Sequence, residues 1–155
     1  MKRVVYFALI VSLMFCLSCG KMVDWAPVNL QVYVQDSAGK DLLDPENGNS
    51  WVEGTTLTFR GEECPIDLEG SPLTKDYMPV FYGFRIEKDG DRYCMVYGEV
   101  DGGMSYKNEE FIIRWPDGTE DVISLTRRLN EITINARNVW RLNGKKTDFP
   151  IVIVK

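Results

Sequence analysis

The chain contains no histidine, and this absence limits the chemistry that its residues can perform. Histidine activates the nucleophile in Ser-His-Asp and Cys-His enzymes and is a common metal ligand. Carboxylates and cysteines are among the side chains left for chemistry. We therefore predict no histidine-activated nucleophile and no imidazole metal site.

Three pairs of adjacent carboxylates have the residue types for acid–base chemistry: Glu62-Glu63, Glu109-Glu110 and Glu120-Asp121. Most glycosidases place two carboxyl groups around the scissile bond. Pairs of this kind near the ends of strands are far more often solvated surface charge. We therefore predict no catalytic residues and no enzyme activity, and keep a small carboxylate-dependent hydrolase as an alternative.

Metal and cofactor sites are not predicted either. Zinc would require Cys64 and Cys94 together with carboxylates, and the chain has no Cys-x-x-Cys spacing. Asp89-Gly90-Asp91 offers oxygens to calcium, but the ligand series of an EF-hand loop is missing and Asp-Gly is a turn signal. Gly102-Gly103 precedes no predicted helix, so we predict no phosphate-binding loop.

The first twenty residues have the composition of an export signal. Lys2 and Arg3 are followed by fourteen uncharged, mostly apolar residues at positions 4–17, and then by the small residues Ser18-Cys19-Gly20. The two cations favour the cytoplasmic side, and the apolar run is shorter than the roughly 20 residues of a spanning helix. We predict a signal peptide over residues 1–18.

The sequence Cys16-Leu17-Ser18-Cys19 resembles a bacterial lipoprotein signal. In that motif an apolar residue, a small or apolar residue and a small residue precede the modified cysteine. Leu17, Ser18 and Cys19 match it, whereas Cys16 stands where leucine is usual. The resemblance implies that Cys19 carries lipid and holds the protein in the cell envelope, with the outer membrane as the expected location and its orientation left open. Cleavage after Gly20, which would release a periplasmic protein, is the alternative.

Beyond the signal we expect a lipid-anchored tether over residues 19–27 and one domain over residues 28–155. Trp25 makes the tether less polar than most linkers, so part of it could pack on the domain. The signal holds two of the 18 basic residues and none of the 23 acidic ones, which leaves a formal net charge of −7. An acidic domain without a basic run is a poor candidate for nucleic acid or anionic lipid. We expect membrane contact through the lipid and no nucleic-acid partner.

Cys64 and Cys94 are the cysteines that remain after Cys16 leaves with the signal and Cys19 is modified. In an oxidising compartment they could form a disulfide. They could also be buried thiols that pack as small hydrophobic groups. The sequence leaves both interpretations open.

Short alternating runs with turn residues roughly every ten positions predict an all-β fold. The clearest run covers positions 28–35, where Val28, Leu30, Val32 and Val34 alternate with polar residues. An open antiparallel β-sandwich is favoured over a closed barrel. Residues 127–130 could form one helical turn. The other predicted strands lie at positions 51–60, 80–87, 92–100, 110–115, 119–125, 131–140 and 149–154.

Parts of this pattern resemble small Bacteroidetes-type envelope lipoproteins. The strand at 28–34 with its turn and Leu42-Leu43-Asp44-Pro45 resembles their first strand, the segment 111–123 around Pro116-Asp117-Gly118-Thr119 resembles their late hairpin, and positions 151–155 resemble their closing strand. These proteins are similar to immunoglobulin-like or transthyretin-like sandwiches and mostly lack an assigned activity. The resemblance implies the fold more than the function.

The apolar face of each alternating run predicts the core. A register shifted by one residue would move every one of these side chains to the opposite face. The predicted core residues are Leu30, Val32, Val34, Leu57, Phe59, Phe84, Ile86, Ile113, Ile132 and Ile134.

The long irregular segment at 61–77 and the strand start after it predict a binding surface, because long loops on rigid scaffolds often carry recognition. Tyr77 and Phe81 are its predicted contact residues, and the alternative is that these rings cover the fold itself. We predict a non-catalytic envelope lipoprotein that binds or scaffolds a glycan or an envelope protein. A glycan-binding accessory module of a polysaccharide-uptake system is the first alternative.

We expect Cys19→Ala to release the protein from the membrane fraction, because Cys19 is the predicted lipid acceptor. Cell fractionation and intact-mass measurement test this. An unlipidated mature chain that begins at Lys21 would show that the signal is of the ordinary cleaved type.

Overall fold

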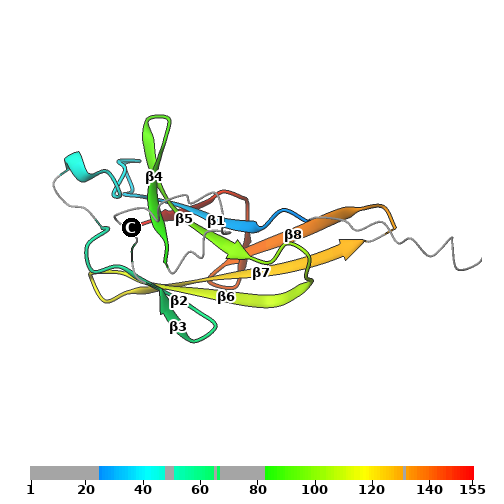
Figure 1. Cartoon of the computed structure of the whole chain (residues 1–155). Helices are drawn as coiled ribbons and strands as arrows, with labels where there is room; N and C mark the ends of the chain where they lie inside the picture. Colours follow the sequence, from blue (N-terminus) through cyan, green and yellow to red (C-terminus); the bar gives the residue numbers. More distant parts are fainter. Residues whose placement is uncertain (1–24, 48–50, 65, 67–82, 131) are drawn as a thin grey trace, which may run out of the picture.

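The computed structural model describes residues 25–47, 51–64, 66, 83–130 and 132–155, arranged as shown in Figure 1. These residues form an all-β fold of two open sheets with one short 3-10 helix, η1 (Pro45–Asn47). None of the described segments is a helix long and apolar enough to cross a membrane.

The smaller sheet has four strands in the order β10 (Ile151–Val154), β1 (Val28–Gln35), β5 (Arg92–Val100) and β4 (Arg85–Asp89). β5 runs antiparallel to both of its neighbours, whereas β10 runs parallel to β1. The prediction of a wholly antiparallel fold is therefore wrong for this sheet. A strand alternates buried and exposed residues in the same way whether it pairs parallel or antiparallel, so the sequence pattern of β10 could not distinguish the two pairings.

The larger sheet has six strands, and each pair of neighbours in it is antiparallel. β7 (Glu120–Asn130) is its longest strand and pairs with β8 (Asn135–Leu142) from Ile123 to its end, so that this hairpin extends to one end of the molecule (Figure 1). In order across the sheet the strands are β3 (Glu62–Cys64), β2 (Thr56–Phe59), β6 (Tyr106–Arg114), β7 (Glu120–Asn130), β8 (Asn135–Leu142) and β9 (Lys145–Thr147).

Both sheets bury one face in a single hydrophobic core. The Tyr97 ring of β5 lies 5.4 Å from the Phe59 ring of β2 and 5.9 Å from the Phe111 ring of β6, so aromatic contacts join the sheets. Ile86 is half-buried at the edge of this core. The prediction is confirmed for the seven residues Leu30, Val32, Val34, Leu57, Phe59, Phe84 and Ile113.

The predicted strand at 131–140 is wrong at its start, and so is the predicted helical turn at 127–130, which is the end of β7. Ile132 and Ile134, both predicted to be buried, are 94% and 45% exposed. The Asn130 side-chain oxygen accepts the backbone N–H of Ile132 and of Thr133, each at 3.0 Å, and so turns the chain. These interactions replace the expected strand with a hairpin tip.

The buried carboxylate of Asp121 connects the two sheets at the end where β7 begins and β10 finishes. Asp121 of β7 accepts hydrogen bonds at 2.7 Å from Trp115 Nε1, Asn143 Nδ2 and Lys155 Nζ. Burial alone would raise the pKa of Asp121, but the donors Lys155, Asn143 and Trp115 outweigh it, and the pKa is lowered. Lys155 follows β10 in the other sheet, so this ion pair crosses between the sheets.

The exposed position of Ile132 predicts that Ile132→Ala changes the free energy of unfolding by less than about 0.5 kcal/mol. Ile123→Ala, at a fully buried site on β7, should lower it by about 2–5 kcal/mol. Urea unfolding of the two variants measures both values. A loss of several kcal/mol for Ile132→Ala would show that position 132 is packed in the core.

The lowered pKa of Asp121 makes part of the stability dependent on pH. This contribution is complete above the ordinary carboxyl pKa of 3.8 and is lost as the pH falls through the lower pKa of the folded state. We expect Asp121→Asn to cost about 3–5 kcal/mol near neutral pH, because Lys155 loses its buried partner.

Urea unfolding of both proteins across the acid range tests this, and their difference should shrink as the pH falls. Asp148→Asn, at an exposed carboxylate, is the control and should have little effect at any pH. An Asp121→Asn cost that does not change with pH would contradict the assignment.

Candidate functional site

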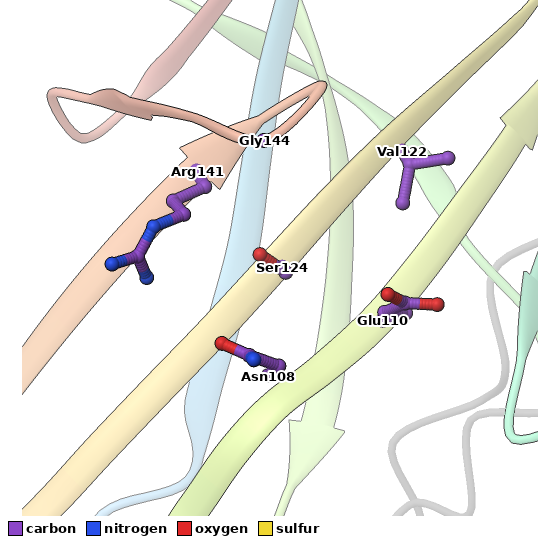
Figure 2. A pocket seen from close by; sticks show the side chains of 6 residues that line it. All are labelled: Asn108, Glu110, Val122, Ser124, Arg141 and Gly144. Carbon is purple, nitrogen blue, oxygen red and sulfur yellow. The ribbon is translucent and has the colours of Figure 1, made fainter.

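One hollow lies on the outer face of the six-stranded sheet (Figure 2). It is a shallow depression of about 350 Å³, and Val122 is its one side chain of purely hydrocarbon character. The described residues that line it include no aromatic ring, so we interpret it as solvated sheet surface. The residues that line it are Asn108, Glu110, Val122, Ser124, Arg141 and Gly144.

A larger hollow of about 600 Å³ lies between the start of β1 and the β7–β8 pair. Its size is within the range of small-molecule sites. Three aromatic side chains come to it from separate parts of the chain, together with amide groups and one guanidinium. We call it the aromatic cleft and define it by Trp25, Asn29, Gln31, Arg127, Asn138, Trp140 and Phe149.

The cleft has a rigid aromatic wall. Trp140 of β8 is buried and lies 6.3 Å from the core ring of Phe111, which holds it in place. The Phe149 ring stacks on Trp140 with their centroids 5.3 Å apart and their planes 18° from parallel. Phe149 remains 44% exposed, so part of its ring is available for contact with a ligand.

Arg127 of β7 lies buried beside this wall. Its Nε and Nη2 donate to the carbonyl oxygen of Gly102 at 3.2 and 2.8 Å, and its Nη1 donates to Asn138 Oδ1 at 2.9 Å. Its guanidinium carbon is 5.9 Å from the Trp25 ring centre. Among the described residues no carboxylate forms an ion pair with it. The cleft therefore has a buried positive charge held by neutral acceptors.

The segment that leads into β1 forms the opposite wall. A Cβ at Gly102 would lie 1.8 Å from the carbonyl oxygen of Ala26, so this approach of the two backbones requires glycine. Trp25 is half-buried here. The expectation that part of the tether packs on the domain is confirmed for Trp25.

Three of the residues predicted from the sequence lie outside the described residues: Cys19, Tyr77 and Phe81. Their roles in lipid attachment and ligand contact stay predictions.

The two remaining cysteines are free and buried, and no disulfide joins them. Cys64 belongs to the shared core, whereas Cys94 alternates with the core residues Met95 and Tyr97 and so faces the opposite side of its sheet. The backbone of the four-stranded sheet therefore separates the two side chains. Burial raises the pKa of both thiols, which makes them poor nucleophiles.

The carboxylate pairs supply structural ion pairs. Glu109 binds Arg60 at 2.5 Å, Glu120 binds Arg114 at 2.7 Å, and Asp121 is the buried partner of Lys155. Glu62 and Glu63 are exposed on β3. The described part of the chain contains no group of three or more His, Cys, Asp or Glu residues arranged to hold a metal ion.

Sequence reasoning did not identify the cleft. Trp25, Trp140 and Phe149 are far apart in the chain, and each fits the alternative of a ring that covers the fold. Arg127 is the residue whose position in the sequence could have pointed to the cleft. It occupies the next inward-facing position of β7 after Ile123 and Leu125, where an apolar residue is expected.

Comparisons of this chain with protein-family models, with curated proteins and with solved structures find no match.

Proposed function

We propose that this chain is a non-catalytic lipoprotein of the cell envelope that binds a ligand in the aromatic cleft. The two sheets that share one core support a β-sandwich similar to the immunoglobulin-like or transthyretin-like domains of small envelope lipoproteins. The signal at residues 1–18 and Cys19 support attachment by lipid, with the outer membrane as the location.

The described side chains favour binding over chemistry. Glu109, Glu120 and Asp121 are each occupied by a cation, and the thiols of Cys64 and Cys94 have raised pKa values. Among the described residues that line the aromatic cleft there is no carboxylate. A ligand there would meet rings, amides and a guanidinium, which hold molecules but do not supply a general acid and base.

The observation that carries the proposal is the partly exposed Phe149 ring, held rigid by Trp140, beside the polar side chains of Gln31 and Asn138. Rigid aromatic rings give a large contact area at low entropic cost, and amides give directional hydrogen bonds. This combination suits a carbohydrate, which has an apolar ring face and a rim of hydroxyl groups. It favours the glycan-binding alternative.

Arg127 adds a preference for charge. A buried guanidinium without an ion-pair partner among the described residues would be stabilised by a carboxylate in the ligand. The proposed ligand class is therefore an acidic oligosaccharide rather than a neutral one. An envelope protein that presents a carboxylate beside an apolar group is the other candidate, and it would use the same side chains.

We expect an oligogalacturonate to bind more tightly than a malto-oligosaccharide of equal length. Phe149→Ala should weaken binding by about 1–2 kcal/mol, or roughly 5- to 30-fold in Kd, because it removes the exposed ring. Calorimetric titration gives the Kd, and the fluorescence of Trp25 and Trp140 gives an independent signal.

The matched control is Val152→Ala, which removes an exposed apolar side chain of β10 outside the cleft and should leave binding unchanged. Equal binding by the Phe149→Ala variant and the parent would show that the cleft is not the site. Hydrolysis of the oligosaccharide that is abolished by changing one carboxylate would overturn the non-catalytic assignment.

A further inference from the structure

The exposed large apolar side chains of the described residues form two groups. In the first group Phe149 lines the aromatic cleft, and Val152 and Val154 lie on the exposed face of the edge strand β10. In the second group Met104 lies in the loop between β5 and β6, and Ile132 and Ile134 lie between β7 and β8. Figure 1 shows that the β7–β8 hairpin projects at one end of the molecule.

The β5–β6 loop and the hairpin meet at this end. Ser105 Oγ accepts a hydrogen bond from the backbone N–H of Leu129 at 3.2 Å, which places the loop beside the last residues of β7. Met104 is 53% exposed on the loop, and Ile132 is 94% exposed at the hairpin tip. Ile132 and Ile134 thus face solvent at the hairpin tip, and Met104 faces solvent on the loop beside β7, in an otherwise acidic chain.

The backbone of Ile134 has an unfavourable conformation. Its φ of 50° lies in the left-handed region, which β-branched residues rarely adopt. Glycine or asparagine would fit this turn position with less strain and less exposed apolar surface. A strained, exposed isoleucine is therefore explained poorly by stability and better by contact with something outside the chain.

The hairpin is locally basic, although the domain as a whole is acidic and its overall charge led us to expect no contact with anionic lipid beyond the lipid anchor. Arg128 and Arg137 face each other across the strand pair, and both are exposed. Positions 126–138 contain three arginines, of which Arg127 is buried, and one acidic residue, Glu131, which lies outside the described residues. Arginines behind an apolar tip match the phosphate layer above the acyl chains of a bilayer.

The chain enters the domain beside the base of the same hairpin. Trp25 contacts Arg127, which pairs with Asn138 in the neighbouring strand. Ile134, at the tip, is four residues from Asn138 along the chain, or about 13 Å in an extended strand. Cys19 is six residues before Trp25, which gives a tether of at most about 20 Å. A lipid on Cys19 and the hairpin tip can therefore reach one membrane surface together.

We propose that the β7–β8 tip is a second membrane contact, in which Ile132 and Ile134 enter the headgroup layer of an anionic phospholipid bilayer and Arg128 and Arg137 bind its phosphates. This inference depends on the proposed lipid attachment, which brings the tip to the surface. A stable protein partner would need roughly 800 Å² of contact on this side, far more than three side chains supply.

The experiment places a nitroxide at Thr133→Cys in the full chain bound to phosphatidylethanolamine–phosphatidylglycerol vesicles. Thr133 is exposed between the two isoleucines, and Cys64 and Cys94 are buried from the label. The chain used is the mature lipidated one, in which Cys16 has left with the signal and the lipid blocks the Cys19 thiol. The label should lose collisions with a water-soluble nickel reagent and gain collisions with oxygen. A label at Ala38→Cys, in the turn after β1, should keep full exposure to nickel.

Adding Ile132→Ser and Ile134→Asn to the labelled chain should abolish the protection at position 133. The melting temperature should stay equal or rise, because asparagine relieves the strain at 134. Adding Arg128→Gln and Arg137→Gln should reduce protection on anionic vesicles and change it little on phosphatidylcholine vesicles.

Nickel exposure at 133 equal to that at 38 on vesicles would overturn the proposal, and so would protection that appears without vesicles as the protein concentration rises. Intact mass reports separately whether Cys19 carries lipid, so failure of the attachment and failure of the tip contact are distinguished.

Discussion

The buried carboxylate of Asp121 is the interaction that fixes how the two sheets meet. It holds the turn after β6 through Trp115, the turn after β8 through Asn143, and the end of β10 through Lys155. The Lys155 ammonium also lies 4.7 Å from the Trp115 ring centre. A buried ion needs full compensation by hydrogen bonds, and three donors supply it here. Because Lys155 follows β10, the carboxylate joins the parallel edge of the small sheet to the large one.

This arrangement leaves the two ends of the domain different. At the Asp121 end, turns and side chains close the gap between the sheets. At the other end β7 and β8 continue beyond Arg127 and Asn138 to the tip, while β1 begins at Val28. The aromatic cleft forms where the sheets part, and the exposed tip forms where β7 and β8 have no opposing sheet. Both proposed contact regions thus follow from one mismatch in strand length.

The sequence predicted what depends on local pattern. Strand β1 and most of the core follow from alternation, and the hairpin turns follow from Asp-Gly and Asn-Gly, with Asn143 and Gly144 both at positive φ. It failed where tertiary contacts decide. Ile132 and Ile134 continue an alternating pattern, but the Asn130 side chain binds the backbone and turns the chain first. The parallel pairing of β10 and the gathering of the cleft aromatics depend on contacts between distant segments, which no local pattern contains.

Two features oppose folding, and both lie at the end of the domain that carries the aromatic cleft and the β7–β8 tip. Arg127 buries a charge without an ion-pair partner among the described residues, and Ile134 holds a strained conformation with an exposed side chain. At the Asp121 end the buried charge is paired with Lys155, and the positive φ there belongs to Asn143, a residue type that tolerates it. Local rules are usually broken where function requires it. A carboxylate in the cleft would pair with the Arg127 charge, and burial of the Ile134 side chain in a membrane would offset its exposure to water. The two proposals therefore explain different costs, and each can be correct without the other.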